Sequence, residues 1–452
     1  MKADVVSNSR TIAQFVAETR TRRPPEAVLD AARMCLVDWV AVATGAQGEP
    51  VGRVVRDVAS RWNAQGRSTL LLGGASGAVG AALCNGTLAH CLDFDDTYVK
   101  ANTHTSAPLW AATLAMGEDV GASEREMLCA FLTGFEVSAR IGYGLGEAVT
   151  ARGFHATGVF GRLAAAAACA ALMKLETRTA QHALGVAATQ ASGLVGSFGT
   201  MSKPFHAGKA AMDGVLSAQL AAAGFEAATH LFDPGGGFDT AIIQDKAVSI
   251  TPADFSSWEI LGNSFKPYAA CHLTHPAIDA ARELGLTAAD MARAKAIRID
   301  VGALAHQVTG EKSGAPPGPM EAKFDLKYCV ALALTGRPIS AADFVDPLPE
   351  DPRIPDLVDK MTAASHPACG YASAAIEVVF DGAPARRIHI PEAKGHPGNP
   401  MTWDDMRAKF EGLVEPVAGA STQAIFDSLR DFGGESGSGL KTIRMLSAAL
   451  ND

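Results

Sequence analysis

Apolar residues recur at helical spacing along most of the first half of the chain. Between Thr11 and about Phe225, Ala, Leu, Val and Gly dominate, and few stretches alternate as a strand does. Because residues three and four positions apart share one face of a helix, this pattern predicts buried helices. Small side chains on nearly every turn let helix axes approach closely, which favours a tightly packed helical assembly. The clearest predicted helices span 27–43, 107–117, 124–141, 158–175 and 207–223.

The pattern changes after about residue 260. Residues 296–301 alternate apolar and charged side chains, which is typical of a half-buried strand. Residues 375–380 and 386–390 are rich in Val and Ile and are joined through Asp381-Gly382, so they predict a hairpin. Helical patterns return between the strands and after them, at 331–334, 355–364, 402–413 and 421–429.

These patterns predict a mainly α protein with two domains. A large all-helical domain is expected from residues 1–263 and 395–452, and a smaller α+β domain from residues 264–394. The Gly- and Pro-rich segment 395–400 is expected to end the smaller domain. The C-terminal helices are then expected to pack back on the first domain.

Charge and cysteine content exclude some classes of protein. The 452 residues carry 48 acidic and 39 basic side chains, a net charge of −9, and contain no dense Lys/Arg block, so a nucleic-acid partner is not expected. The eight cysteines stand singly without a CxxC pair, as free thiols of a reducing compartment do. The N-terminus has no apolar leader and the longest Ala-rich run, 163–173, is too short to span a bilayer. We therefore expect a cytoplasmic protein without a membrane partner.

A glycine-rich segment at 70–80 imitates the turn of a dinucleotide-binding unit. Asp93 even lies at a suitable distance for a contact with a ribose. That motif requires a strand, a helix and a second strand, however, and the residues after Gly80 continue as an Ala-rich helix into an acidic cluster. A glycine-rich loop that enters a helix is the favoured interpretation, and no nucleotide cofactor is predicted.

The densest polar cluster follows this helix. His90, Asp93, Asp95 and Asp96 lie within seven residues, and His104 follows closely. Three neighbouring carboxylates repel one another unless a cation or a shared proton lies nearby, so such a cluster points to a functional site. Two alternatives stay open at this point: Asp side chains that only cap a solvated helix end, and a metal site built on Asp and His.

Three further segments carry His or Lys next to predicted helices. His155 and Lys203 each precede or open a helix in a Gly-containing segment, where the positive end of the helix dipole favours an anion. Lys266 lies with His272 and His275 where the fold class changes, and ligands often bind at such boundaries. Each of these residues taken alone is a weak signal.

Together the segments resemble the MmgE/PrpD family, which includes 2-methylcitrate dehydratase, cis-aconitate decarboxylase and iminodisuccinate epimerase. The matching runs occur in family order from about residue 10 to 430: HCLDFDDTYVKANTHTSAP, GFHATGVFGRLAAAAACA, KPFHAGKAAMDGVLSAQLA, FKPYAACHLTHPAIDA and KFDLKYCVALAL. The resemblance implies a large helical domain, a smaller α+β lid, a homodimer, and chemistry without a metal or an organic cofactor.

Carried over position by position, the family's site pattern falls on seven residues. The implied catalytic residues are Asp93, His104, His155 and Tyr328, and the implied substrate-binding residues are Thr97, Lys203 and Lys266. The neighbouring polar residues are expected to have supporting or structural roles: His90, Asp95, Asp96, His206 and His275.

These residue types suit chemistry at a carbon next to a carboxylate. A proton at such a carbon is weakly acidic, so a base must act together with fixed cations that neutralise the developing charge. The lysines are the expected cations, the two site histidines the acid and base, and Asp93 the group that orients one imidazole. Tyr328 is expected to donate a proton or a hydrogen bond, and Thr97 to position a carboxylate.

The favoured activity at this stage is a hydro-lyase that dehydrates a 2-methylcitrate-like tricarboxylate. Epimerisation of an iminodisuccinate-like dicarboxylate and decarboxylation of cis-aconitate are the alternatives within the family. A protein that only binds a dicarboxylate, without catalysis, is the alternative from a different class.

Overall fold

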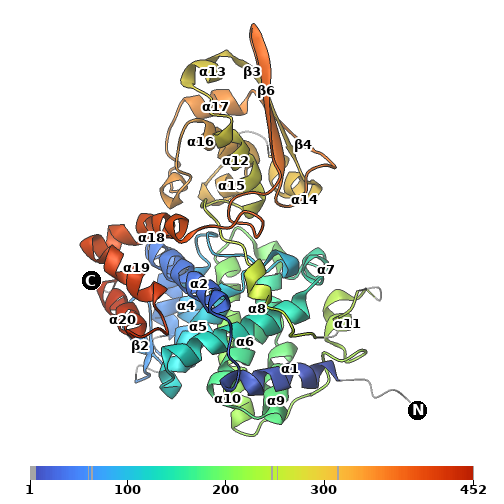
Figure 1. The fold of residues 1–452 in the computed structure, drawn as a ribbon, viewed down its shortest axis with the longest axis vertical. Coiled ribbons are helices and arrows are strands. Elements are labelled where there is room, and N and C mark those ends of the chain that lie inside the picture. The colour runs from blue at the N-terminus through green and yellow to red at the C-terminus, as the bar shows by residue number, and fades with distance from the viewer. Residues whose placement is uncertain are drawn as a thin grey trace. The chain divides into compact units, whose positions relative to one another are not determined.

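The computed structural model describes residues 7–59, 61–62, 65–245, 248–251, 253–312 and 315–450 (Figure 1). The chain divides into two compact units, Met1–Ser264 with Met406–Asp452, and Phe265–Asp405. The first is helical and the second contains a mixed sheet, so the predicted mainly α class with a smaller α+β domain is confirmed.

The second boundary lies after Asp405, whereas we expected it after residue 394. The Gly- and Pro-rich segment remains tied to the smaller unit by backbone hydrogen bonds. The Phe265 amide donates to the Gly395 carbonyl at 2.9 Å, and the Lys394 amide donates to Oδ2 of Asp279 at 2.7 Å. The segment expected to end the smaller unit is therefore part of it.

The helical unit is built around α8, Ala156–Leu172, in which every residue is buried. A mostly apolar helix of this kind belongs in a core, and α5, α6, α9 and α10 pack around it. Its one charged residue, Arg162, is paired with Asp213. Its other helices are α1 Asn8–Ala17, α2 Glu26–Gly45, α3 Pro50–Ala59, α4 Ala78–Ala89, α5 Ser106–Val120, α6 Glu124–Gly142, α7 Gly146–Ala151, α9 Thr177–Thr189, α10 Ser202–Ala222, α11 Phe238–Ile243, α19 Thr422–Arg430 and α20 Gly439–Ala449, while α18, Trp403–Ala418, begins just before the boundary at Met406.

Close contact between these helices depends on residues without a side chain. A Cβ atom built on Gly208 of α10 would lie 2.2 Å from the Leu83 carbonyl oxygen of α4. A Cβ atom on Gly214 would lie 2.3 Å from that of Ala165 in α8. The small residues noted in the sequence therefore bring α4, α8 and α10 close together, and these three helices carry or border the polar cluster.

The smaller unit contains a four-stranded sheet in the order β4-β3-β5-β6. Antiparallel β5 and β6 form the predicted hairpin, β3 pairs antiparallel with β5, and β4 pairs parallel with β3. Helix α12 packs against β5 and β6, and α16 packs against α12. The strands are β3 Ala294–Val301, β4 Met361–Ser365, β5 Ala374–Phe380 and β6 Ala383–Ile390, and the helices are α12 His275–Glu283, α13 Ala288–Arg293, α14 Ala303–Ala305, α15 Pro319–Lys323, α16 Leu326–Leu334 and α17 Arg353–Val358.

Two local expectations can be compared directly with the structure. The predicted helix over 355–364 is wrong in its second half, because α17 ends at Val358 and β4 begins at Met361. The glycine-rich segment near residue 70 forms a short antiparallel pair, β1 Ser68–Thr69 with β2 Ala75–Ser76, and then enters α4. A dinucleotide-binding unit has parallel strands at this point, whereas this segment forms an antiparallel pair.

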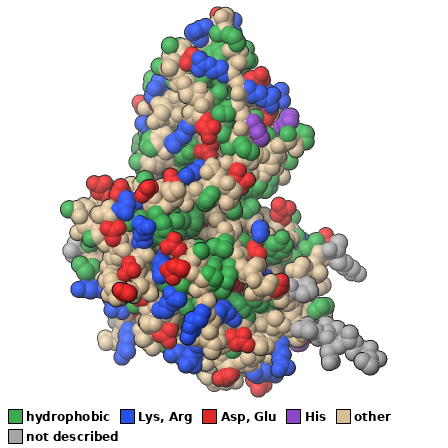
Figure 2. Space-filling view, in the orientation of Figure 1, with side chains coloured by type: hydrophobic (Ala, Val, Ile, Leu, Met, Phe, Trp, Pro, Cys, Tyr) green, Lys and Arg blue, Asp and Glu red, His purple; other side chains and the backbone are tan. Residues whose placement is uncertain are grey.

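Two further observations concern the charges on the surface and the hydropathy of the helices. Figure 2 shows Lys/Arg and Asp/Glu side chains interspersed on the visible face of the helical unit. Within the described ranges, none of the helices has the combination of length and hydropathy needed to cross a bilayer.

Candidate active site

The acidic turn after α4 places its first carboxylate against a lysine. Asp93 adopts a left-handed backbone conformation with φ of 54°, which turns the chain out of the helix. Its Oδ1 accepts a hydrogen bond from Nζ of Lys203, which stands in the first turn of α10. Both side chains are buried, at 5% and 7% exposure. This contact joins two segments that are 110 residues apart in sequence.

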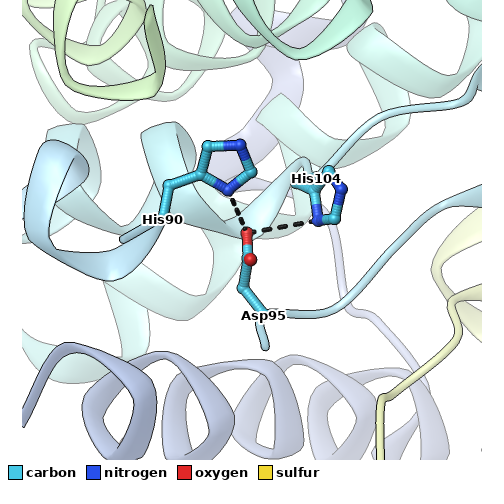
Figure 3. A group of neighbouring side chains, drawn as sticks. All are labelled: His90, Asp95 and His104. Atoms are coloured by element: carbon cyan, nitrogen blue, oxygen red, sulfur yellow. Dashed lines mark hydrogen bonds and ion pairs between the residues drawn. The ribbon is translucent and has the colours of Figure 1, made fainter. Parts of the chain in front are cut away.

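The second carboxylate of the turn lies between two imidazoles (Figure 3). Oδ2 of Asp95 lies 2.8 Å from Nδ1 of His90 and 3.3 Å from Nδ1 of His104. His90 caps the C-terminus of α4, whereas His104 follows the turn and its backbone amide donates to Oγ1 of Thr157 in α8 at 3.0 Å. The three side chains therefore form one cluster held by two helices.

A second pair of imidazoles adjoins this cluster. His155 is the N-cap residue of α8, and its amide donates to the Gly193 carbonyl at 3.0 Å. Nδ1 of His155 lies 3.2 Å from Nδ1 of His206 in α10, so one ring donates and the other accepts. The His155 ring lies 5.6 Å from that of His90, and Phe198 packs against its edge.

Burial and neighbouring charges control the protonation of these groups. Burial lowers the pKa of His90 to about 4 despite the adjacent Asp95 carboxylate. Burial, with His90 and Lys203 nearby, holds the pKa of His155 well below its usual range. Burial alone would raise the pKa of Asp95, but the imidazoles of His90 and His104 outweigh it and hold that pKa well below the usual value. At neutral pH the cluster thus contains an ionised Asp95 and neutral His90 and His155.

The third carboxylate of the turn belongs to a separate buried network. Oδ2 of Asp96 accepts hydrogen bonds from the Ser106 hydroxyl and from Nδ2 of Asn263, the latter at 2.6 Å. Burial and the neighbouring Asp38 raise the pKa of Asp96 to about 7. Nζ of Lys409 in α18 lies 2.5 Å from Oδ1 of Asp38 and donates to the Phe94 carbonyl at 2.7 Å. Because the Asp96 amide donates to Asp38 and the Phe94 carbonyl accepts from Lys409, this network fixes the backbone of the turn.

The helical unit thus brings together four of the seven sequence-predicted site residues, Asp93, His104, His155 and Lys203. A fifth, Thr97, is buried on the same loop, where its backbone pairs with Ser264. Among the described residues, the buried Oγ1 of Thr97 has no hydrogen-bond partner.

Lys266 and Tyr328 belong to the smaller unit. Lys266 is 1% exposed. Tyr328 stands in the first turn of α16, where its amide donates to the N-cap carboxylate of Asp325 at 3.0 Å. It also lines a cavity of about 850 Å³ within that unit. Burial raises the pKa of Tyr328, which keeps the phenol protonated.

The structure shows where two carboxylates of the turn lie. We expected Asp93 to orient an imidazole; Asp93 accepts a hydrogen bond from Lys203, and Asp95 lies beside His104. Asp95, His90 and His206 were expected only in supporting roles, and all three lie in direct contact with site residues. The carboxylates are too close in sequence for spacing alone to distinguish them, because the backbone of the turn decides where each one points.

His90, Asp95 and His104 form a group that could hold a metal ion. Their ligand atoms lie within 4.8 Å of one another. Nδ1 of His90 forms a hydrogen bond with Oδ2 of Asp95 at 2.8 Å, whereas Nδ1 of His104 lies 3.3 Å from the same oxygen as an ion-pair contact outside hydrogen-bond geometry. The donor set suits a borderline cation such as zinc, and chelation tests this alternative.

The sequence was compared with protein-family models and with known proteins. The MmgE/PrpD N-terminal domain matches residues 10–251 and the MmgE/PrpD C-terminal domain matches residues 268–431. The chain is 26% identical to cis-aconitate decarboxylase of Mus musculus over 73% of this chain and 70% of that protein. It is 26% identical to the Homo sapiens decarboxylase over 73% and 71% of the two chains. The Aspergillus terreus decarboxylase is 24% identical over 78% and 77%. The polar cluster lies entirely within the N-terminal match.

Proposed function

Because the chain belongs to the MmgE/PrpD family, we propose that it is a lyase that acts on a small tricarboxylate by acid–base chemistry without a cofactor. The observation that carries this proposal is that His104 and His155 both lie next to His90, and that the Lys203–Asp93 pair is buried. Decarboxylation of cis-aconitate is the first candidate reaction, because the relatives described above are cis-aconitate decarboxylases. Dehydration of 2-methylcitrate, favoured by the sequence alone, is the second.

The residues suit the difficult part of either reaction. Decarboxylation leaves an electron pair on a carbon near a carboxylate, and dehydration removes a proton from such a carbon. In both cases a fixed cation stabilises the developing charge, and Lys203 offers a buried ammonium close to the imidazoles. An imidazole then transfers the proton in either direction.

Lys266, Tyr328 and Thr97 complete the proposed site residues. Lys266 would bind a second carboxylate, Tyr328 would donate a proton or a hydrogen bond, and the Thr97 hydroxyl would position the substrate. These roles are tested by replacing each residue singly with Met, Phe and Val, respectively, and measuring kcat and KM. Unchanged constants in all three variants would remove these residues from the site.

Incubation in deuterated water separates the candidate reactions. The purified protein is given cis-aconitate, 2-methylcitrate or iminodisuccinate, and the products are followed by NMR and by carbon dioxide release. We expect carbon dioxide from cis-aconitate, with one deuterium in the product. Loss of water from 2-methylcitrate would assign the dehydratase instead. Deuterium exchange without loss of either small molecule would support the epimerase and contradict both lyase proposals.

Two controls test the remaining alternatives. Exhaustive chelation is expected to leave turnover unchanged, and a loss of activity that zinc restores would favour a metal centre on His90, Asp95 and His104. His104→Ala is expected to abolish turnover while tricarboxylate still raises the melting temperature. If the wild-type protein binds all three acids but converts none, it is a binding protein and the lyase proposal fails.

A further inference from the structure

The two imidazoles that share Asp95 differ in their access to a substrate. The side chain of His90 is 0% exposed, whereas that of His104 is 15% exposed. His90 also remains neutral, since burial lowers its pKa to about 4. His104 is therefore the member of the cluster that a ligand can reach, and the His90 side chain is enclosed within the protein.

The protonation state of Asp95 determines which nitrogen of each ring carries hydrogen. An ionised carboxylate only accepts hydrogen bonds, and Oδ2 of Asp95 faces Nδ1 of both His90 and His104. Nδ1 of His90 donates to this oxygen at 2.8 Å, and Nδ1 of His104 lies 3.3 Å from it without hydrogen-bond geometry. A carboxylate this close repels a lone pair on Nδ1, so it favours the Nδ1–H form of both rings. In the neutral imidazole the other nitrogen has a free lone pair, so Nε2 of His104 is the basic atom.

The position of His104 is fixed from other directions as well. Its backbone amide donates to Oγ1 of Thr157 at 3.0 Å, and Thr157 lies in the first turn of the fully buried α8. The preceding residue, Thr103, pairs with Tyr98 through two backbone hydrogen bonds of 2.8 and 3.2 Å. With the backbone held in this way, contact with Asp95 determines the orientation of the ring. This arrangement of a reachable imidazole and a buried carboxylate is the one that orients a proton-transfer group in many enzymes.

We propose that Asp95 is a positioning residue that holds His104 in the Nδ1–H form, so that Nε2 of His104 is the atom that exchanges a proton with the substrate carbon. This inference rests on the proposed function and assigns one proton-transfer atom within it. Asp93 is the hydrogen-bond partner of Lys203.

The proton transfer can be written for decarboxylation with all atoms balanced. His104 first takes a proton from solvent at Nε2, and Asp95 stabilises the resulting imidazolium. The bond between the substrate carbon and its carboxylate then breaks, carbon dioxide leaves, and the electron pair remains on the substrate. The Nε2 proton moves to that electron pair, and His104 returns to the neutral Nδ1–H form. Dehydration uses the same atom in the opposite direction, as a base.

Two measurements test the proposal, one of them without a substrate. In ¹⁵N-histidine-labelled protein at a pH where imidazoles are neutral, the ¹⁵N shifts are expected to show His104 protonated at Nδ1, with the signal assigned by its loss in His104→Asn. In the substrate assay, Asp95→Asn is expected to lower kcat by about 10² to 10⁴ fold while KM changes only a few-fold. The matched control is Asp96→Asn, a change of the same kind at the adjacent buried position, which should keep most of kcat.

Each outcome decides a separate question. A proton on Nε2 of His104 in the wild-type protein would overturn the proposal, and so would an Asp95→Asn variant that retains wild-type kcat. A wild-type protein without turnover on any of the three acids would overturn the proposed function, while the ¹⁵N measurement would still decide the role of Asp95. If Asp95→Asn does not fold, as judged by circular dichroism, the wild-type ¹⁵N shifts decide alone.

Discussion

Adjacent aspartates in one turn have three different environments. Asp93 pairs with Lys203, Asp95 lies between two imidazoles, and Asp96 lies in a buried network with its pKa raised to about 7. The sequence could identify this turn as the chemical centre, because three carboxylates in four residues need compensation. It could not assign the partners, since these come from α4, α10 and the loop before α5, and the left-handed Asp93 sets their directions.

The Lys203 ammonium is expected to bind a substrate carboxylate as well as Asp93. Lys203→Met should therefore raise KM for the active tricarboxylate by about 10 to 100 fold, the usual effect of losing a charge-assisted hydrogen bond. Steady-state kinetics on the wild type and the variant measure this change. Lys209→Met is the matched control on the same helix, because Lys209 is more exposed and its partner Asp213 keeps a second ion pair with Arg162.

Removing Lys203 also leaves the Asp93 carboxylate without this partner. The double variant Lys203→Met/Asp93→Asn separates this effect from substrate binding, because it removes both charges. We expect the double variant to melt closer to the wild type than the single variant does, and to retain the high KM. A KM equal to that of the wild type in both variants would show that Lys203 only neutralises Asp93.

Element types were predictable where the residue pattern itself decides them. The Ala-rich helix α8 and the hairpin of β5 and β6 were evident from their periodicity. Strand β4 was not, because its sequence Met-Thr-Ala-Ala-Ser lacks β-type alternation and its alanines favour a helix. Its extended form is fixed by parallel pairing with β3. β3 begins at Ala294, 67 residues before β4 begins at Met361. Such long-range pairing is a tertiary effect that local propensity does not contain.

Helix α18 is expected to stabilise the acidic turn through one buried lysine. The Lys409 side chain is 2% exposed and contacts both Asp38 and the Phe94 carbonyl. Lys409→Met would leave the Asp38 carboxylate buried beside Asp96 without its cation, so we expect a loss of about 3 to 5 kcal/mol in the free energy of unfolding. Denaturant unfolding followed by circular dichroism measures this loss.

Two further variants make the interpretation specific. Lys441→Met removes an exposed lysine of α20 and should change stability by less than about 0.5 kcal/mol. The double variant Asp38→Asn/Lys409→Met should recover part of the loss, because it removes the unpaired charge. If Lys409→Met unfolds like Lys441→Met, then the ion pair does not hold α18 against the turn.

At the scale of the whole chain, family resemblance carried the prediction further than composition did. Composition established only a large apolar core and an acidic balance, while five ordered segments identified the MmgE/PrpD family, which both domain matches confirm. The boundary near residue 264 was visible as a change of periodicity. The boundary after Asp405 was not, because it depends on backbone hydrogen bonds from Phe265 and Lys394 to partners that are distant in sequence.

The stability of the protein is expected to depend on pH through Asp96. Its pKa in the folded state is about 7, whereas an unfolded aspartate titrates near 4, so folding favours the protonated form. The corresponding stability is fully present below about pH 4 and is lost as the pH rises through about 7. Asp96→Asn cannot titrate and keeps a similar shape, so it serves as the control.

Between pH 5.5 and pH 8, we therefore expect the free energy of unfolding to fall more in the wild type than in Asp96→Asn, by on the order of 2 kcal/mol. His90 works in the opposite direction, because its folded pKa of about 4 lies below the usual value, but it is common to both proteins and cancels in the difference. Guanidinium unfolding at the two pH values measures the effect, and parallel pH dependences would mean that Asp96 is ionised in the folded protein at both.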